Sequence, residues 1–240
     1  MTITNRKRLA ENLAQVRERI AQACARSKRE PSEVRLVAVT KSASLAAIKE
    51  LVQLGQEDLA ESRVQQLTQR AEELEAWRAK LESPPTIRWH MVGQLQRNKV
   101  KACVAVASTI HSIDSLRLAE EISARAVREG REIDCLLEVN CSEEAQKSGV
   151  AVGAAVHLAD QISTLKSIRL VGLMTMGPLV ANPDQARFAF ARLRDLFDEA
   201  RFEKIGGRDF VHLSMGMSND FEVAVEEGAT ILRIGTALFQ

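Results

Sequence analysis

Short runs rich in β-branched residues alternate with longer amphipathic stretches along almost the whole chain. The runs that read as strands are Val34–Thr40, Glu57–Glu61, Ile87–Val92, Thr109–Ile113, Ile133–Asn140, Ile168–Met174, Phe210–Leu213 and Thr230–Ile234. The stretches that read as helices are Thr4–Ser27, ahead of the first strand, and Ser44–Leu54, Arg63–Lys80, Ser115–Glu129, Val152–Ser163, Pro183–Phe202 and Ser218–Glu227. Repeated alternation of strand and helix predicts parallel strands joined by right-handed crossovers.

Eight such strands in 240 residues fit a closed barrel better than an open doubly wound sheet. An open sheet usually has fewer strands and a glycine-rich first turn, and the sequence contains no GxGxxG pattern. We therefore expect an α/β fold, a single (β/α)8 TIM-type barrel formed by one domain over residues 1–240. Only Thr236–Gln240 follows the last strand, so we expect no eighth crossover helix. The N-terminal helix is expected to cover part of that gap.

Overall charge and composition argue against several classes of protein. The chain has 33 basic and 32 acidic residues, and a net charge of +1 offers no electrostatic footprint for nucleic acid. The basic segment Arg97–Lys101 lacks interleaved aromatic residues, so it reads as a solvated helix start rather than a nucleic-acid patch. No run approaches the roughly 20 apolar residues of a membrane helix, and the polar N-terminus does not resemble a secretion signal. We expect a cytoplasmic protein that does not bind membranes.

The four cysteines lie in segments that read as helix or strand, and they form no CxxC pair. This usage is typical of free thiols in a reducing compartment. A disulfide between Cys135 and Cys141 is the less favoured alternative, because a chain of this length can bury enough apolar surface to be stable without a disulfide.

The carboxyl ends of the strands are where a barrel of this kind carries its functional groups. The loops after the seventh and eighth strands are the most informative, because barrels often bind phosphate with this pair of loops. They read SMGMS at residues 214–218 and RIGT at residues 233–236. Their glycines let main-chain amides approach an anion, and Ser214, Ser218 and Thr236 add hydroxyl donors. Ser218 is also placed to cap the following helix. Together the loops predict a phosphate site, although either one alone also fits ordinary capping and turn formation.

The first strand, VAVTKS at residues 37–42, ends on a lysine. A lysine in this position is most often a solvated residue at the barrel rim. Close to a phosphate site, Lys41 suggests either charge neutralisation or a Schiff base with pyridoxal phosphate, whose aldehyde is attacked by a neutral amine. The residues alone leave both roles open.

Several segments together resemble the pyridoxal phosphate homeostasis proteins, the YggS/PROSC family. They are VAVTKS at 37–42, WHMVGQLQRNK at 89–99, HSIDS at 111–115, LEVNCSEEAQKSG at 137–149, GLMTMGP at 172–178, HLSMGMSNDFEVAVEEGAT at 212–230 and RIGTALF at 233–239. The resemblance runs from about Val34 to the C-terminus, and SMGMSxD followed by RIGT is its most specific part. It implies a single barrel similar to the N-terminal domain of alanine racemase.

The resemblance also implies a cofactor and the residues that hold it. The cofactor is pyridoxal 5′-phosphate, carried as a Schiff base on Lys41, with Arg233 facing the pyridine nitrogen. The other implied cofactor-binding residues are Ser62, His90, Met174, Ser214, Gly216, Ser218, Gly235 and Thr236. This chain reads Ala60-Glu61-Ser62 where the family usually has Gly-Glu-Asn, so a contact made by that asparagine is shortened or lost.

The resemblance favours a non-enzymatic protein of vitamin B6 homeostasis that holds and delivers pyridoxal phosphate, with indirect effects on amino-acid pools. Pyridoxal-phosphate-dependent apoenzymes are the expected recipients, and a monomer is the expected state. In the related racemases a tyrosine from a separate domain supplies a second proton donor, and this chain has no tyrosine. An arginine at the pyridine nitrogen also keeps that nitrogen unprotonated, which weakens the electron sink of most pyridoxal phosphate chemistry.

Two enzymatic alternatives remain open from the sequence. The first is a pyridoxal-phosphate-dependent amino-acid racemase that uses His90 or Cys141 as an unrecognised base. The second is a metal-dependent hydrolase built on His90, His111 and His212, which come from three different strands. The second is disfavoured because the sequence has no HxH or HExxH spacing.

Overall fold

The computed structural model describes residues 3–144, 146–178 and 180–240, and its eight parallel strands close into a barrel. The strands follow one another around the barrel in sequence order, and β1 pairs with both β2 and β8. The strands are β1 (Arg35–Val39), β2 (Asp58–Glu61), β3 (Arg88–Met91), β4 (Thr109–Ile113), β5 (Ile133–Glu138), β6 (Ile168–Met174), β7 (His212–Ser214) and β8 (Ile231–Ile234). The predicted barrel is confirmed.

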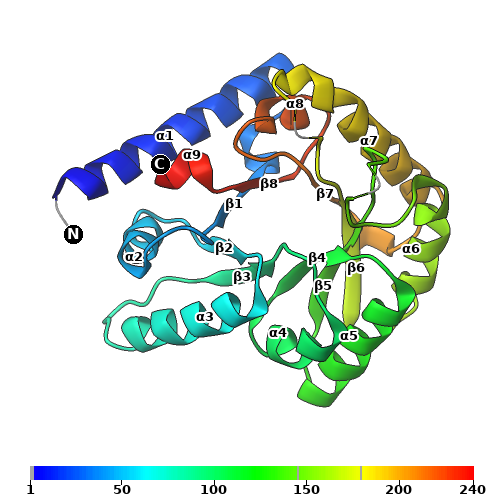
Figure 1. Ribbon diagram of the computed structural model, residues 1–240, viewed down its shortest axis with the longest axis horizontal. Coiled ribbons are helices and arrows are strands. Elements are labelled where there is room, and N and C mark those ends of the chain that lie inside the picture. The colour runs from blue at the N-terminus through cyan, green and yellow to red at the C-terminus, as the bar shows by residue number, and fades with distance from the viewer. Residues whose placement is uncertain (1–2, 145, 179) are drawn as a thin grey trace.

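Helices surround the barrel on its outside (Figure 1). They are α1 (Ile3–Arg26), α2 (Leu45–Gln53), α3 (Val64–Arg78), α4 (Val100–Val106), α5 (Leu116–Glu129), α6 (Ala155–Ser163), α7 (Arg187–Phe202), α8 (Phe221–Glu226) and α9 (Thr236–Phe239). Short 3-10 turns lie at Pro31–Glu33, Arg97–Lys99, Val152–Ala154, Pro183–Ala186 and Gly207–Asp209. The sequence predicted only the start of α4, at Arg97–Lys101, and not its extent, because the seven residues VKACVAV show no clear helical period. No helix in the described ranges is long and apolar enough to cross a bilayer.

Helix α1 lies where a full eighth crossover helix would otherwise pack. Only the single turn α9 follows β8, and α1 runs beside α8 and α9 (Figure 1). Nδ2 of Asn12 donates hydrogen bonds of 3.0 Å to the carbonyl oxygens of Leu238 and Gln240. The buried face of α1 repeats at helical spacing and consists of Leu9, Leu13, Val16, Ile20, Ala23 and Cys24. The N-terminal helix therefore covers the gap, as the sequence predicts.

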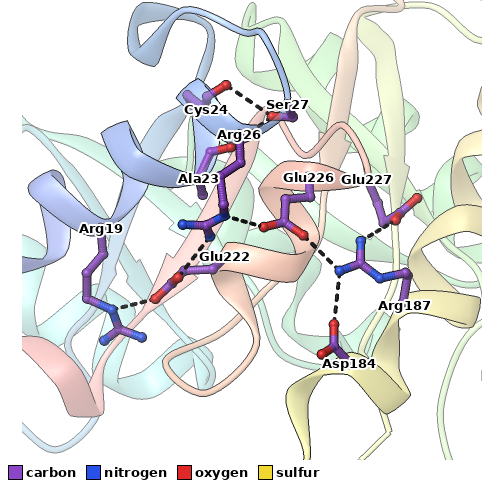
Figure 2. A network of polar contacts seen from close by, with 10 residues as sticks. All are labelled: Arg19, Ala23, Cys24, Arg26, Ser27, Asp184, Arg187, Glu222, Glu226 and Glu227. Atoms are coloured by element: carbon purple, nitrogen blue, oxygen red, sulfur yellow. Dashed lines mark hydrogen bonds and ion pairs between the residues drawn. The ribbon is translucent and has the colours of Figure 1, made fainter.

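Ion pairs on the surface fasten α1 to α8 and then to the start of α7 (Figure 2). Glu222 accepts from Arg19 at 2.7 Å and from Arg26 at 3.0 Å, and Arg26 also pairs with Glu226 at 2.7 Å. Arg187 continues the series, with contacts of 2.6 to 2.9 Å to Asp184, Glu226 and Glu227. We call this set the outer ion-pair network; its members are Arg19, Arg26, Asp184, Arg187, Glu222, Glu226 and Glu227.

The interior of the barrel holds both apolar and polar side chains. Because side chains alternate along a strand, each strand contributes one set of residues to the barrel interior and another to the helix-facing core. Most buried apolar residues form the core between barrel and helices. Two smaller apolar clusters are separate from it: Val37, Ala60 and Ile231, and Leu136, Val171 and Met174. The buried polar residues that lie with them are Asp58, His90, His111, Ser214 and Arg233.

All four cysteines are buried free thiols. The alternative of a disulfide between Cys135 and Cys141 is therefore wrong. Cys135 lies on β5. Cys141 lies two residues after Val139, which forms an isolated bridge with Val150 beyond the end of that strand.

Candidate functional site

A cavity of about 400 Å³ opens at the carboxyl ends of the strands. This volume falls in the range of roughly 300–1,000 Å³ that small-molecule sites occupy. The wall is formed by residues at or after the carboxyl ends of β1, β2, β3, β6, β7 and β8. They are Val39, Lys41, Ser42, Ser62, Val92, Gly93, Met176, Pro178, Val180, Pro183, Met217, Ser218, Asn219, Asp220, Arg233, Gly235 and Thr236.

Lys41 lies in the turn between β1 and α2, and its side chain is exposed at the cavity. The turn is fixed on both sides of the lysine. The amide of Ala43 donates to the carbonyl of Thr40 at 2.9 Å, and Ser44 caps α2 by accepting from the amide of Ala47 at 3.2 Å. A firmly held backbone thus presents the Lys41 amine to solvent-accessible space.

A buried carboxyl group, Glu61, lies behind this turn at the end of β2. It accepts a hydrogen bond from Oγ1 of Thr40 at 2.5 Å and pairs with Nε of Arg70 at 3.0 Å. Burial raises the pKa of Glu61, while the Thr40 hydrogen bond and the charges of Arg70 and Lys41 oppose that rise. Glu61 therefore links β1, β2 and α3 beneath the lysine and provides a nearby acidic group.

The loops after β7 and β8 meet at another part of the cavity wall. Oγ of Ser218 accepts a hydrogen bond from the amide of Ala237 at 3.2 Å, which joins the two loops. Helix α8 begins at Phe221, so Asp220 holds the N-cap position, and its Oδ1 accepts from the amide of Met217 at 2.6 Å. The N-cap predicted for Ser218 is wrong, because its hydroxyl is used to reach α9 instead.

Glycine is required at Gly216 in the first of these loops and fits most easily at Gly235 in the second. Gly216 has a φ of +93°, and a Cβ atom there would lie 2.6 Å from Cβ of Ala224. A Cβ atom at Gly235 would lie 3.0 Å from the carbonyl oxygen of Val39. Within residues 3–144, 146–178 and 180–240, the amides of Gly235 and Thr236 donate to no backbone carbonyl. Both amides are therefore available to an anion.

Arg233 forms the floor of the cavity and is only 4% exposed, so its charge needs partners inside the protein. Nη1 donates to Oγ of Ser214 at 2.6 Å, and Nη2 donates to the carbonyl of Thr175 at 2.9 Å. Burial lowers the pKa of Arg233 to about 10, and the charges of Glu138 and Asp220 oppose the fall. Arg233 is therefore still a cation at neutral pH. Burial also raises the pKa of the neighbouring Glu138 to about 7, against the charge of Arg233.

Below this floor, polar side chains continue down the barrel interior. Oγ of Ser214 lies 2.8 Å from Nδ1 of His111, and Nε2 of His111 lies 2.9 Å from Nδ1 of His90. Nε2 of His90 lies 3.0 Å from Oδ1 of Asp58, the first residue of β2. We call these residues, from Asp58 through His90, His111 and Ser214 to Arg233, the polar column.

The structure brings six of the ten predicted site residues to the cavity wall: Lys41, Ser62, Ser218, Arg233, Gly235 and Thr236. The other four lie outside that wall. His90 and Ser214 belong to the polar column, and Met174 packs with Leu136 and Val171. Gly216 supports the loop after β7, where its carbonyl accepts from the amide of Arg233.

Several wall residues were not identified from the sequence. Asn219 and Asp220 stand within the quoted SMGMSND segment, so its position after β7 was the available signal. Val39 and Val92 are apolar strand-end residues, which read as core and carry no chemical signal of their own.

The residues named for the enzymatic alternatives lie apart from the cavity. Neither His90 nor Cys141 is part of its wall, and burial raises the pKa of the Cys141 thiol to about 11. Nδ1 of His212 lies 3.2 Å from Oγ1 of Thr230. No group of three or more His, Cys, Asp or Glu residues in the described part of the chain is arranged to hold a metal ion. The basic segment at Arg97 forms a 3-10 turn that leads into α4, the predicted helix start.

This chain matches a known protein family and is similar in sequence to a characterised group of proteins. Residues 4–240 match the model of the family described as alanine racemase, N-terminal domain. The chain is 39% identical over 229 residues to the pyridoxal phosphate homeostasis protein of Aquifex aeolicus, covering 95% of this chain and 96% of that protein.

Two solved structures are also similar. One is the crystal structure of an unknown protein from Bifidobacterium adolescentis, with a TM-score of 0.92 and 37% identity, covering 100% of this chain and 97% of that one. The other is PipY of Synechococcus elongatus with pyridoxal phosphate bound, with a TM-score of 0.81 and 33% identity. That alignment covers 97% of this chain and 100% of PipY.

Proposed function

Because the chain belongs to the pyridoxal phosphate homeostasis proteins, within the alanine racemase N-terminal domain family, we propose that it binds pyridoxal 5′-phosphate at Lys41 and holds it without catalysis. One observation carries the proposal. The exposed amine of Lys41 shares a single cavity with the two loops after β7 and β8 and with the cation Arg233. These three features match the three polar groups of pyridoxal phosphate. The amine matches the aldehyde, the two loops match the phosphate, and the cation matches the pyridine nitrogen.

Each part of the cavity would have its own task. The amides of Gly235 and Thr236, with the hydroxyl of Ser218, would hold the phosphate, supported by the tight turn at Gly216. The cofactor would supply an aldehyde, and Lys41 would supply the neutral amine that condenses with it, with release of water.

The remaining predicted residues would shape the site around the ring. Arg233 has no acceptor, so against the pyridine nitrogen it can only donate and would keep that nitrogen unprotonated. Ser62 belongs to the cavity wall. His90, Met174 and Ser214 would act from beneath the cavity rather than by lining the ring.

The titratable residues of the wall support a carrier rather than a racemase. Among the described residues they are Lys41, Asp220 and Arg233. Arg233 is a donor only, and one oxygen of Asp220 is engaged by the amide of Met217 at 2.6 Å. Asp220 is thus the one residue in this set that could serve as the second acid–base group that racemisation needs, and its bond to Met217 favours the carrier.

The proposal extends to location and partners. Buried free thiols fit a protein of a reducing compartment, and we propose a monomer in the cytoplasm. The exposed side chain of Lys41 would let the cofactor exchange, so apoenzymes that need pyridoxal phosphate are the proposed recipients.

Titration of the purified full chain with pyridoxal phosphate, followed by visible absorbance, tests the proposed function. We expect a saturable new band with the unaltered chain and none with Lys41→Ala. The matched control is Lys49→Ala, which removes a lysine of α2 that lies over the ring of Trp77 and outside the cavity wall. The control should bind like the parent, and a band of full height in Lys41→Ala would reject the proposed site.

Incubation with each common L-amino acid separates the carrier from the racemase. The loaded protein is expected to leave the chirality of the amino acid unchanged over many hours. Sustained conversion to the D-enantiomer, lost in Lys41→Ala, would establish the racemase instead.

A further inference from the structure

The polar column joins the two ends of the barrel interior by hydrogen bonds. Asp58 opens β2 at the lower end, while Ser214 closes β7 at the cavity end. The five residues are 0–5% exposed, so water does not compete for these bonds. The proposed carrier function requires no acid–base chemistry of Asp58, His90 or His111.

The upper end of the column allows two directions of hydrogen bonding. An arginine side chain has no acceptor, so Nη1 of Arg233 donates to Oγ of Ser214. Oγ of Ser214 keeps a second lone pair and its own hydrogen, so it can either accept from Nδ1 of His111 or donate to it. If it donates, a neutral His111 carries its hydrogen on Nε2. In that case His111 donates from Nε2 to Nδ1 of His90, and His90 donates from Nε2 to Asp58.

The lower end of the column decides between these two directions. Although burial alone would raise the pKa of Asp58, hydrogen bonds from Arg88 and His90 hold it well below the usual range. Asp58 is therefore a carboxylate and only accepts. Burial lowers the pKa values of both His90 and His111, so both rings are neutral at pH 7. Every member of the column then has its donors and acceptors matched, with no conflict along its length.

We propose that Asp58, His90 and His111 are positioning residues that aim the Ser214 oxygen at Arg233 and thereby set the guanidinium at the floor of the cavity. A neutral imidazole could donate from either nitrogen, and the column selects one tautomer at two successive rings. With the Ser214 hydrogen committed to His111, a lone pair of Oγ is always available to Nη1 of Arg233. The negative charge of Asp58 also polarises each bond toward itself, which favours the cation at the other end.

The tautomers can be observed directly, without any cofactor. Long-range 1H–15N correlation spectra of the 15N-labelled full chain distinguish Nε2–H, Nδ1–H and doubly protonated rings. His157→Gln and His212→Gln variants assign the remaining signals. At pH 7 we expect His90 and His111 both as neutral Nε2–H tautomers. An Nδ1–H tautomer or a protonated ring at either position would overturn the proposal.

A second measurement tests the positioning role and rests on the proposed function. Asp58→Asn removes the charge and lets an amide nitrogen face His90, so the dissociation constant for pyridoxal phosphate should rise about fivefold, the worth of one hydrogen bond. Arg88→Gln is the matched control, because it removes the other partner of Asp58, bonded at 2.8 Å, and leaves the column intact. It should change the constant less than about twofold.

The outcomes of the two measurements are separable. Equal effects of Asp58→Asn and Arg88→Gln would mean that Asp58 acts only through its ion pair, and the positioning role would be rejected. Failure of the unaltered chain to bind pyridoxal phosphate would defeat the proposed function, whereas the tautomers would still decide whether the column is built as inferred.

Discussion

The polar column and the outer ion-pair network are both series of polar contacts, and their lengths are alike. Contacts run from 2.6 to 3.0 Å in the column and from 2.6 to 3.0 Å in the network. They differ in their surroundings. The column residues are at most 5% exposed, whereas the side chain of Arg26 in the network is 48% exposed (Figure 2).

The length of a polar contact therefore does not by itself show how much that contact contributes to the free energy of unfolding. When one member of the network is removed, its partners turn to water, and an exposed ion pair contributes little. When one member of the column is removed, its neighbours keep their polar atoms buried and unmatched. Four substitutions, ordered from the largest expected effect to the smallest, test the contrast.

His111→Leu should have the largest effect on stability. It leaves the Ser214 hydroxyl and Nδ1 of His90 without their partner inside the barrel. We expect the free energy of unfolding to fall by about 3 kcal/mol. Urea denaturation followed by circular dichroism measures this quantity. A loss below about 1 kcal/mol would show that the column behaves like a surface contact.

Gly216→Ala tests whether a buried backbone position is likewise more sensitive to substitution than an exposed one. Gly216 and Gly55 have similar φ values, +93° and +88°, but a Cβ atom at Gly55 meets nothing within 4 Å. Gly55→Ala should cost about 1 kcal/mol for its strained φ alone. Gly216→Ala should cost about 2–3 kcal/mol, because its Cβ also overlaps Ala224, and it should weaken cofactor binding. Equal losses in urea denaturation would contradict the packing account of this loop.

Glu138→Gln should change how stability depends on pH. Burial raises the folded-state pKa of Glu138 to about 7 from 4.5 in the unfolded chain, so the folded protein retains the proton longer. The contribution of Glu138 is fully present below pH 4.5 and is lost as the pH rises toward 7. Relative to the parent, Glu138→Gln should therefore gain about 1–2 kcal/mol between pH 4.5 and pH 8. Denaturation curves at both pH values measure it, and a constant difference would refute the shift.

Arg26→Ala should have the smallest effect. It removes two ion pairs of the outer network, yet Glu222 and Glu226 keep Arg19 and Arg187 as partners. We expect a loss below about 1 kcal/mol, and less at 1 M salt, because exposed charges are screened. A thermal denaturation series at low and high salt checks this. A loss as large as that of His111→Leu would remove the distinction between the two regions.

Local sequence patterns were sufficient for the barrel and for the part of the site that lies in loops. Strand periodicity predicted β1 to β8, and glycine with serine after β7 and β8 predicted the cradle. Lys41 stood out because an ammonium at the end of an apolar run has no packing role. In each case the signal lies within a few neighbouring residues, which is why sequence reading could find it.

The depth of side chains in the barrel could not be predicted in this way. The resemblance implies His90 and Met174 as cofactor-binding residues; in the structure both are buried, and neither is part of the cavity wall. Depth depends on strand register and tilt, which arise from pairing around the whole barrel. The polar column likewise depends on five strands, β2, β3, β4, β7 and β8, being in register. The cap at Asp220 was missed because Ser218 and Asp220 both suit an N-cap, and only the link to Ala237 decides between them.

The central claim is that Lys41 holds pyridoxal phosphate covalently. The most direct test is to saturate the full chain with pyridoxal phosphate, reduce it with borohydride and map the pyridoxyl group by peptide mass spectrometry. We predict one major label, on Lys41, with loss of the visible band and no corresponding label in Lys41→Arg. A label on another lysine at full occupancy, or a protein that remains colourless and unlabelled at saturation, would contradict the account.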